Sequence, residues 1–132
     1  MIDNKKSVRV VLVHPPLRNV ISPDTPKYIF ENRGHNPPMG LLYIQAAIER
    51  SRHESIFLDA DLEGWDHRET ARRALSHKPD LVGLQAMSFT LPDAYLVAKM
   101  IKQLDPGVKV VAGGPHPTIY PVETARLDVF DF

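Results

Sequence analysis

Six histidines are the side chains of this 132-residue chain that first suggest acid–base or metal chemistry, and they stand at positions 14, 35, 53, 67, 77 and 116. No two of them have the i, i+4 spacing that lets two imidazoles on one helix bind a single metal ion, so we predict no metal site. We expect His53, His67 and His77 to be solvated or capping residues.

Two histidines differ from the rest because each follows a predicted strand. His14 and His116 could face a ligand together, or each could hydrogen-bond to nearby backbone. Asp59 and Asp61 follow another strand and could act as a general acid and base. Aspartate is also a common turn former, which is the interpretation we favour. No nucleophile is paired with a base, so we predict a binding module with no catalytic residue.

The strand exit VVAGGPHPTIYP, residues 110–121, is the most unusual stretch. Gly113 and Gly114 lack a Cβ, so they either form a tight turn or let a ligand approach the backbone closely. The flanking Pro-His-Pro-Thr favours binding. In the preceding strand exit, Thr90 is expected to cap a helix, whereas Ser88 lies in a loop with room to donate to a ligand.

Composition excludes several classes of function. Sixteen basic and sixteen acidic residues cancel, which argues against nucleic acid and membrane partners. The chain has no cysteine, which excludes disulfides, thiolate nucleophiles and Cys-ligated metal sites within it. The N-terminal apolar run is too short for a secretory signal, and no stretch has membrane-spanning length. We therefore expect a cytoplasmic protein.

Alternating apolar runs and helical patterns must position these residues. The predicted strands are 8–13, 55–58, 80–84 and 108–112. Residues 39–50 are apolar nearly all round and predict a helix buried against the sheet. Asp66 is expected to cap a second helix, and a third is predicted from Thr90 to Leu104. The pattern predicts an α/β fold, a flavodoxin-like or Rossmann-like doubly wound parallel sheet of four to five strands in three α/β/α layers. A fifth strand is expected to begin at Asp128-Val129-Phe130. Its shortness suggests one domain, residues 1–132, excised from a longer protein.

In such a fold, ligands sit beyond the carboxyl ends of the strands. The loops at 15–38, 85–90 and 113–118 should therefore converge on one crevice. The first of these is far longer than a usual βα loop of about 2 to 6 residues. The turn after the first strand reads HPPLRN, which contains no glycine and so matches neither a dinucleotide motif nor a P-loop. Receiver-domain and flavodoxin phosphate sites are also absent from the sequence.

Three segments together resemble a known family: PPMGLLYIQAAIE (37–49), PDLVGLQAMSFT (79–90) and KVVAGGPHPTIYP (109–121). Their order and spacing are similar to those of the N-terminal cobalamin-binding domain of B12-dependent radical SAM enzymes, and the resemblance covers nearly the whole chain. It implies a cobalamin cofactor here. It also implies S-adenosylmethionine and a [4Fe–4S] cluster on a C-x3-C-x2-C motif in a C-terminal radical SAM barrel outside this chain.

The resemblance also implies which residues contact the cofactor. Gly113, Gly114, Ser88 and Thr90 would hold the nucleotide tail, and Leu17, Met39, Pro115 and His116 would lie at the corrin rim. The chain lacks the D-x-H-x-x-G loop of the wider cobalamin-binding group, so we expect no histidine below the cobalt, with His14 as the one residue that could change this. The implied parent is a methyltransferase or a related cyclase.

Two alternatives stay open. The chain could be a non-catalytic scaffold or dimerisation domain of a radical SAM protein that does not use cobalamin, and a homodimer is left open in either case. It could also be a flavodoxin-like domain that binds another nucleotide ligand, although the loop sequences argue against this.

Overall fold

The computed structural model describes residues 6–20, 26–32 and 34–132. Strands and helices alternate along most of this part of the chain. The strands are β1 (Arg9–His14), β2 (Glu54–Asp59), β3 (Leu81–Gln85) and β4 (Lys109–Gly113). The helices are α1 (Lys27–Asn32), α2 (Met39–Glu49), α3 (His67–Ser76), α4 (Leu91–Leu104), α5 (Pro115–Ile119) and α6 (Pro121–Ala125). The predicted strands and the three longer helices are confirmed to within one or two residues.

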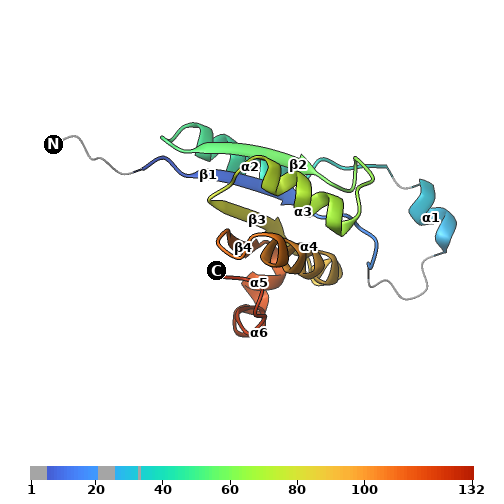
Figure 1. Cartoon of the computed structure of the whole chain (residues 1–132). Helices are drawn as coiled ribbons and strands as arrows, with labels where there is room; N and C mark the ends of the chain where they lie inside the picture. The colour runs from blue at the N-terminus through green and yellow to red at the C-terminus, as the bar shows by residue number, and fades with distance from the viewer. Residues whose placement is uncertain (1–5, 21–25, 33) are drawn as a thin grey trace.

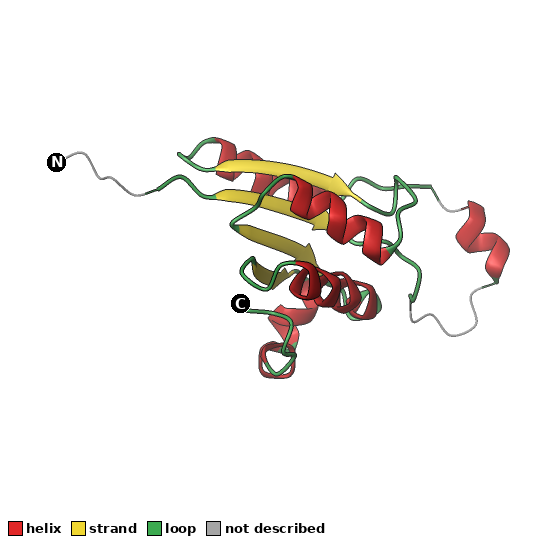
Figure 2. Cartoon of the chain, in the orientation of Figure 1, coloured by secondary structure: helices red, strands yellow, loops and turns green. Residues whose placement is uncertain are grey.

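The four strands form one parallel sheet in the order β2-β1-β3-β4. Their arrows point in the same direction in Figure 2. Val13 of β1 lies opposite Leu58 of β2 on one side and Leu84 of β3 on the other, so the three strands end nearly level. This order and direction confirm the predicted flavodoxin-like fold.

One face of the sheet is well covered. Helices α3 and α4 pack against each other on it, while α2 lies on the opposite face (Figure 1). The covered face buries a large cluster made mostly of small and β-branched side chains from β1, β3, β4, α3 and α4: Val11, Val13, Ala71, Ala74, Val82, Leu84, Ala94, Val97, Ala98, Ile101 and Val110. Alternation along the strands sends these side chains to one face.

The opposite face is only partly covered. Its cluster contains three buried residues, Val10, Leu12 and Leu41. Leu41 is the one buried residue of α2, while Tyr43 and Ile44 are 73% and 49% exposed. The expectation that this apolar helix is buried is therefore wrong. It packs on β1 and β2 with one side, and within the described residues no second helix lies beside it on this face.

The two predicted helix caps have different outcomes. Asp66 caps α3 as expected, because its Oδ1 accepts a hydrogen bond from the Glu69 backbone N–H at 2.7 Å. That bond holds the pKa of Asp66 below its usual range. Thr90 precedes α4, but its hydroxyl accepts from the Met87 N–H at 3.0 Å instead of from the helix, so the predicted cap is wrong.

Two predictions about the C-terminal quarter are also corrected. Residues 113–118 were expected to form a loop, but a short helix, α5, begins at Pro115, because proline suits the first helical position. Residues 128–130 lie in a turn and not in a strand. The strand-like pairing comes later, where the Ala112 N–H donates to the Phe132 carbonyl at 3.0 Å. None of the helices formed by the described residues is long and apolar enough to cross a membrane.

Candidate functional site

The last residues of the four strands share one face. Val10 and Leu12 of β1 pack on the α2 side, so alternation places His14 on that side as well. The register pairs His14 with Asp59 and Gln85 with Gly113, which brings all four strand ends into one row. A ligand lying across the carboxyl ends of the strands would meet this row.

A cavity of about 310 Å³ opens beside this row, and we call it the glycine cavity. It is lined by residues from α2 and from the exits of β3 and β4: Gly40, Leu41, Ile44, Gln85, Met87, Gly113, Gly114 and Pro115. The cavity therefore brings together three residues singled out in the sequence, Gly113, Gly114 and Pro115. It shows that the β3 and β4 exits converge, as predicted.

The two glycines have different physical roles. A Cβ on Gly113 would meet no atom within 4 Å, so the missing side chain leaves open space. Gly114 has φ +112° and ψ −168°, a conformation that is strained for other residues, and a Cβ there would lie 3.0 Å from the Ala86 carbonyl oxygen. Gly114 therefore shapes the turn, and Gly113 keeps the cavity open.

Gln85 is a site residue that the sequence analysis missed. Its side chain lines the glycine cavity, and its Oε1 is buried without a hydrogen-bond partner among the described residues. A buried polar atom without a partner is unfavourable by about 1 to 3 kcal/mol. This oxygen is thus suited to accept a hydrogen bond from a ligand. Its place directly after a predicted strand, as the first residue of the 85–90 loop, was the available signal.

A second, larger cavity of about 450 Å³ runs along the uncovered face of the sheet beside α2, and we call it the α2 groove. It is lined by Val8, Val10, Leu12, Leu41, Ile44, Ile48, His53, Leu81, Gly83, Leu84, Val111 and Gly113. Leu41, Ile44 and Gly113 line both cavities, so the two adjoin each other. Together they offer an apolar channel that opens at the strand ends, and their volumes are typical of ligand sites.

The other predicted tail and rim residues lie around the strand exits without lining either cavity. His116 Nδ1 and Ser88 Oγ are 3.0 Å apart, so the structure brings these two together. Thr90 is only 4% exposed, and its hydroxyl is bonded to the backbone of Met87, which leaves it little room for a ligand. Met39 is 55% exposed at the start of α2, next to Gly40 of the glycine cavity.

The polar residues at the ends of β1 and β2 form side-chain pairs. His14 Nδ1 lies 2.9 Å from Asp59 Oδ1, and that oxygen also accepts from the Leu62 N–H, which confirms a turn role for Asp59. Asp61 accepts a hydrogen bond from the Leu17 N–H at 3.3 Å, and its other oxygen is 3.4 Å from His35 Nδ1. Asp61 therefore ties both arms of the long loop to the end of β2.

Asp93 fixes the first arm of the same loop and was also missed by the sequence analysis. Its carboxylate is fully buried and accepts hydrogen bonds from the Arg18 and Asn19 backbone N–H groups and from the Asn19 side chain. His67 Nε2 lies 2.7 Å away, so the expectation that His67 is merely solvated or capping is wrong. The partners come from sequence positions 26 to 75 residues away, which no local pattern reveals.

Across residues 6–20, 26–32 and 34–132, no three carboxylates or imidazoles are grouped so as to hold a metal ion. The channel is instead mainly aliphatic, with polar atoms at its mouth. It suits a bulky ligand that combines an apolar part with hydrogen-bonding groups.

Comparisons with known proteins point to such a ligand. Residues 28–132 match the family model of the B12 binding domain. The chain is also 35% identical over 121 residues to an uncharacterized methyltransferase of Pyrococcus horikoshii. The match covers 92% of this chain but 25% of the relative, so the chain spans about a quarter of the length of that protein.

Proposed function

The chain belongs to the B12-binding domain family, and on this premise we propose that it binds cobalamin at the strand ends with the nucleotide tail in the α2 groove. One observation supports the proposal: the glycine cavity and the α2 groove adjoin each other at Leu41, Ile44 and Gly113. A ligand at the carboxyl ends of the strands would thus have space for a side group along the sheet.

The residues present fit such a ligand. The groove offers aliphatic walls to a flat aromatic base, and the missing side chain of Gly113 leaves room for a chain of atoms to pass. Gln85 Oε1 is a buried acceptor without a partner among the described residues, and the corrin periphery carries primary amides that donate. Each feature of the channel therefore has a counterpart in cobalamin.

We assign the contacts as follows. Gly113 would border the tail, Gly114 would hold the turn that exposes it, and Gln85 would accept from an amide of the ligand. Ser88 and His116, already a pair, would offer hydrogen bonds at the strand exits, and Leu17 and Met39 remain assigned to the corrin rim. When bound, cobalamin would supply a cobalt ion that can carry a methyl group through a cobalt–carbon bond.

The finer proposal is that the parent protein is a B12-dependent radical SAM enzyme, a methyltransferase or a related cyclase. Support comes from the segments around Pro37–Glu49 and Lys109–Pro121, and from a relative named as a methyltransferase that is about four times as long. The S-adenosylmethionine and [4Fe–4S] sites would lie in a C-terminal barrel outside these 132 residues, with this domain as its partner.

A titration tests the cobalamin proposal. Hydroxocobalamin is added to the purified chain, the mixture is passed over a gel-filtration column, and the visible spectrum of the protein peak is recorded. We expect pigment to travel with the wild-type chain and to be lost in a Gly113→Val variant that keeps the same elution volume and circular dichroism. Absence of pigment from both the chain and its full-length parent would contradict the proposal and favour a scaffold that does not use cobalamin.

A further inference from the structure

One polar side chain lines the otherwise apolar α2 groove. Its other described lining residues are aliphatic or glycine, and the exception is His53, which immediately precedes β2. The groove begins at Gly113 beside the carboxyl ends of the strands and reaches Val8 and His53 at the amino ends. The six residues of β1 span roughly 20 Å, so His53 marks the far end of a long channel.

The tautomer of this histidine follows from its neighbour. The Val8 backbone N–H points at His53 Nδ1, with an N···N distance of 3.1 Å. A backbone amide nitrogen can only donate, so Nδ1 must present its lone pair, and the proton of the neutral ring resides on Nε2. Within the described residues Nε2 has no hydrogen-bond partner. The far end of the groove is therefore lined by an imidazole whose ring is held at Nδ1 and whose Nε2–H is available to donate.

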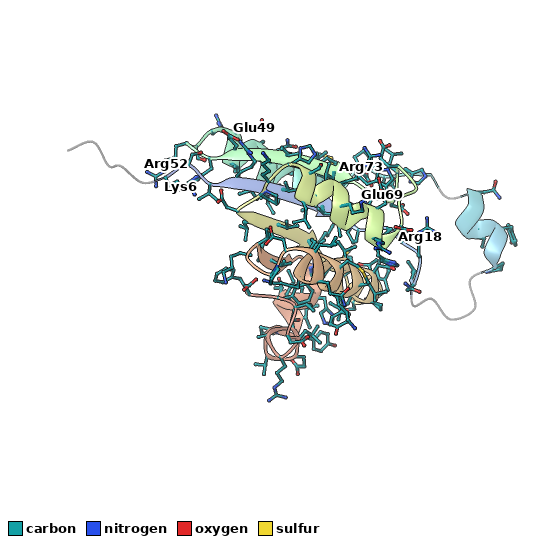
Figure 3. All side chains as sticks on the ribbon, viewed as in Figure 1. Lys6, Arg18, Glu49, Arg52, Glu69 and Arg73 are labelled. Atoms are coloured by element: carbon teal, nitrogen blue, oxygen red, sulfur yellow. The ribbon has the colours of Figure 1, made fainter. Side chains whose placement is uncertain are left out.

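The surroundings make this donor selective. Figure 3 places Arg52, the neighbour of His53, and Lys6 at the same amino-terminal edge of the sheet, but neither lines the groove. A donor among aliphatic walls favours a ligand with a matching acceptor, because a ligand that covers the N–H without accepting from it leaves the N–H unpaired and removed from water. The matching ligand is apolar and carries one acceptor at its end.

We propose that His53 Nε2–H donates a hydrogen bond to a ring nitrogen of the aromatic base at the end of the nucleotide tail. The domain thereby prefers cobamides whose base carries such a nitrogen over those whose base does not. This inference rests on the proposed function and deepens it, because it assigns the ligand class within the groove. It requires no proton transfer and no change in covalent bonding.

Three ligands and four proteins test the inference. The ligands are cobalamin, whose benzimidazole base has a ring nitrogen, a cobamide whose base is a phenol, and cobinamide, which has no base. The proteins are the wild-type chain, His53→Phe, His53→Gln and the control His77→Phe, which changes a histidine that does not line the groove. Affinities are measured by visible-spectrum titration, so the result does not depend on the activity of a parent enzyme.

We expect His53→Phe to weaken cobalamin binding about fivefold, the effect of losing one neutral hydrogen bond. Binding of the phenolic cobamide and of cobinamide should change less than twofold, which also shows that the variant is folded. His53→Gln should recover most of the loss, because its amide N–H can occupy the place of the ring Nε2–H, although both variants lose the acceptor for Val8. His77→Phe should match the wild type with all three ligands.

Other outcomes overturn the inference. Equal weakening of all three ligands by His53→Phe would show a structural role for the histidine. Unchanged cobalamin binding in His53→Phe would show that the aromatic base does not contact His53 and lies elsewhere. In both cases the wild-type chain still binds cobalamin. Failure of the proposed function is distinguishable from these, because then no corrinoid binds the wild-type chain at all.

Discussion

Gly113 and Gly114 are neighbours with opposite requirements. A side chain at Gly113 would enter open space, whereas Gly114 has a backbone conformation that residues with a side chain rarely adopt. A substitution at the first position should therefore act on the ligand, and one at the second should act on the fold. The pair thus separates binding from stability within two residues.

The first prediction compares Gly113→Val with Gly114→Ala. Gly113→Val should leave the free energy of unfolding within about 0.5 kcal/mol of the wild type. It should weaken cobalamin binding by about 1 to 3 kcal/mol, roughly 5- to 150-fold, because an isopropyl group enters the space proposed for the tail. Gly114→Ala should lower the free energy of unfolding by about 1 to 3 kcal/mol. Urea unfolding measures the stability of both variants, and spectral titration measures their cobalamin binding. A loss of binding in Gly114→Ala but not in Gly113→Val would contradict the placement of the tail beside Gly113.

Asp131 supplies the second prediction. Its carboxylate accepts hydrogen bonds from Lys102, the Val110 N–H and Lys109, and the bond from Lys102 contributes most to holding its pKa well below the usual range. With a folded-state pKa below the unfolded value of 3.8, the stabilisation is complete above pH 3.8 and is lost as the pH falls through the folded pKa.

We expect Asp131→Asn to lower the free energy of unfolding by about 1 kcal/mol at pH 7. Below pH 4, the wild type should lose stability faster than the variant, so the two curves approach each other. Urea unfolding between pH 2.5 and pH 7 measures this convergence. Parallel curves over that range would mean that the ion pairs of Asp131 contribute no pH dependence.

At the scale of elements, the loop after β1 depends on α4. Asp93 of α4 accepts hydrogen bonds from the Arg18 and Asn19 backbone N–H groups of this loop. His67 Nε2 of α3 lies within hydrogen-bonding distance of the same carboxylate. The third prediction is that Asp93→Asn lowers the free energy of unfolding by about 2 to 4 kcal/mol, because an amide NH2 cannot accept from these donors.

Two further variants isolate the cause of that loss. His67→Phe should be destabilising by less, about 1 kcal/mol, and the double variant should show a coupling energy with Asp93→Asn above about 0.5 kcal/mol. Asp66→Asn is the matched control, since asparagine caps a helix as well as aspartate does and should change stability by less than 0.5 kcal/mol. Additive single effects at Asp93 and His67 would contradict the shared site.

The elements differ in how far the sequence could predict them. Strand positions were predictable, because buried parallel strands are recognised from continuous apolar runs, and the exits of β3 and β4 do converge at Gly113. The exposure of most of α2 was not predictable, because an apolar helix pattern does not reveal which neighbouring elements cover the helix. The bond between Asp93 and His67 was invisible for another reason, as it joins two helix starts through the tertiary fold alone.

At the scale of the whole molecule, the two faces of the sheet are unequally stabilised. The face under α3 and α4 buries most of the apolar core, whereas α2 contributes one buried residue, Leu41, and borders the groove. Local opening requires least free energy where few apolar contacts are lost. The helix beside the candidate site should therefore be the weak side of the ligand-free domain.

The fourth prediction follows from this asymmetry and is checked by hydrogen exchange of backbone amides under native conditions. Without ligand, the amides of α2 should exchange at least about tenfold faster than those in the middle of α4, which corresponds to about 1.4 kcal/mol less free energy of opening.

Cobalamin at 100 times its dissociation constant should slow exchange of the α2 amides by up to about 100-fold, because opening of α2 must release the ligand. Cobinamide, which has no base to fill the groove under this proposal, should protect the start of α2 near Gly40 but less of its end near Ile48. The prediction is contradicted if the amides of α2 and α4 exchange at the same rate without ligand and are slowed equally by cobalamin. The two faces of the sheet would then open together, and the groove would not be the deformable side of the fold.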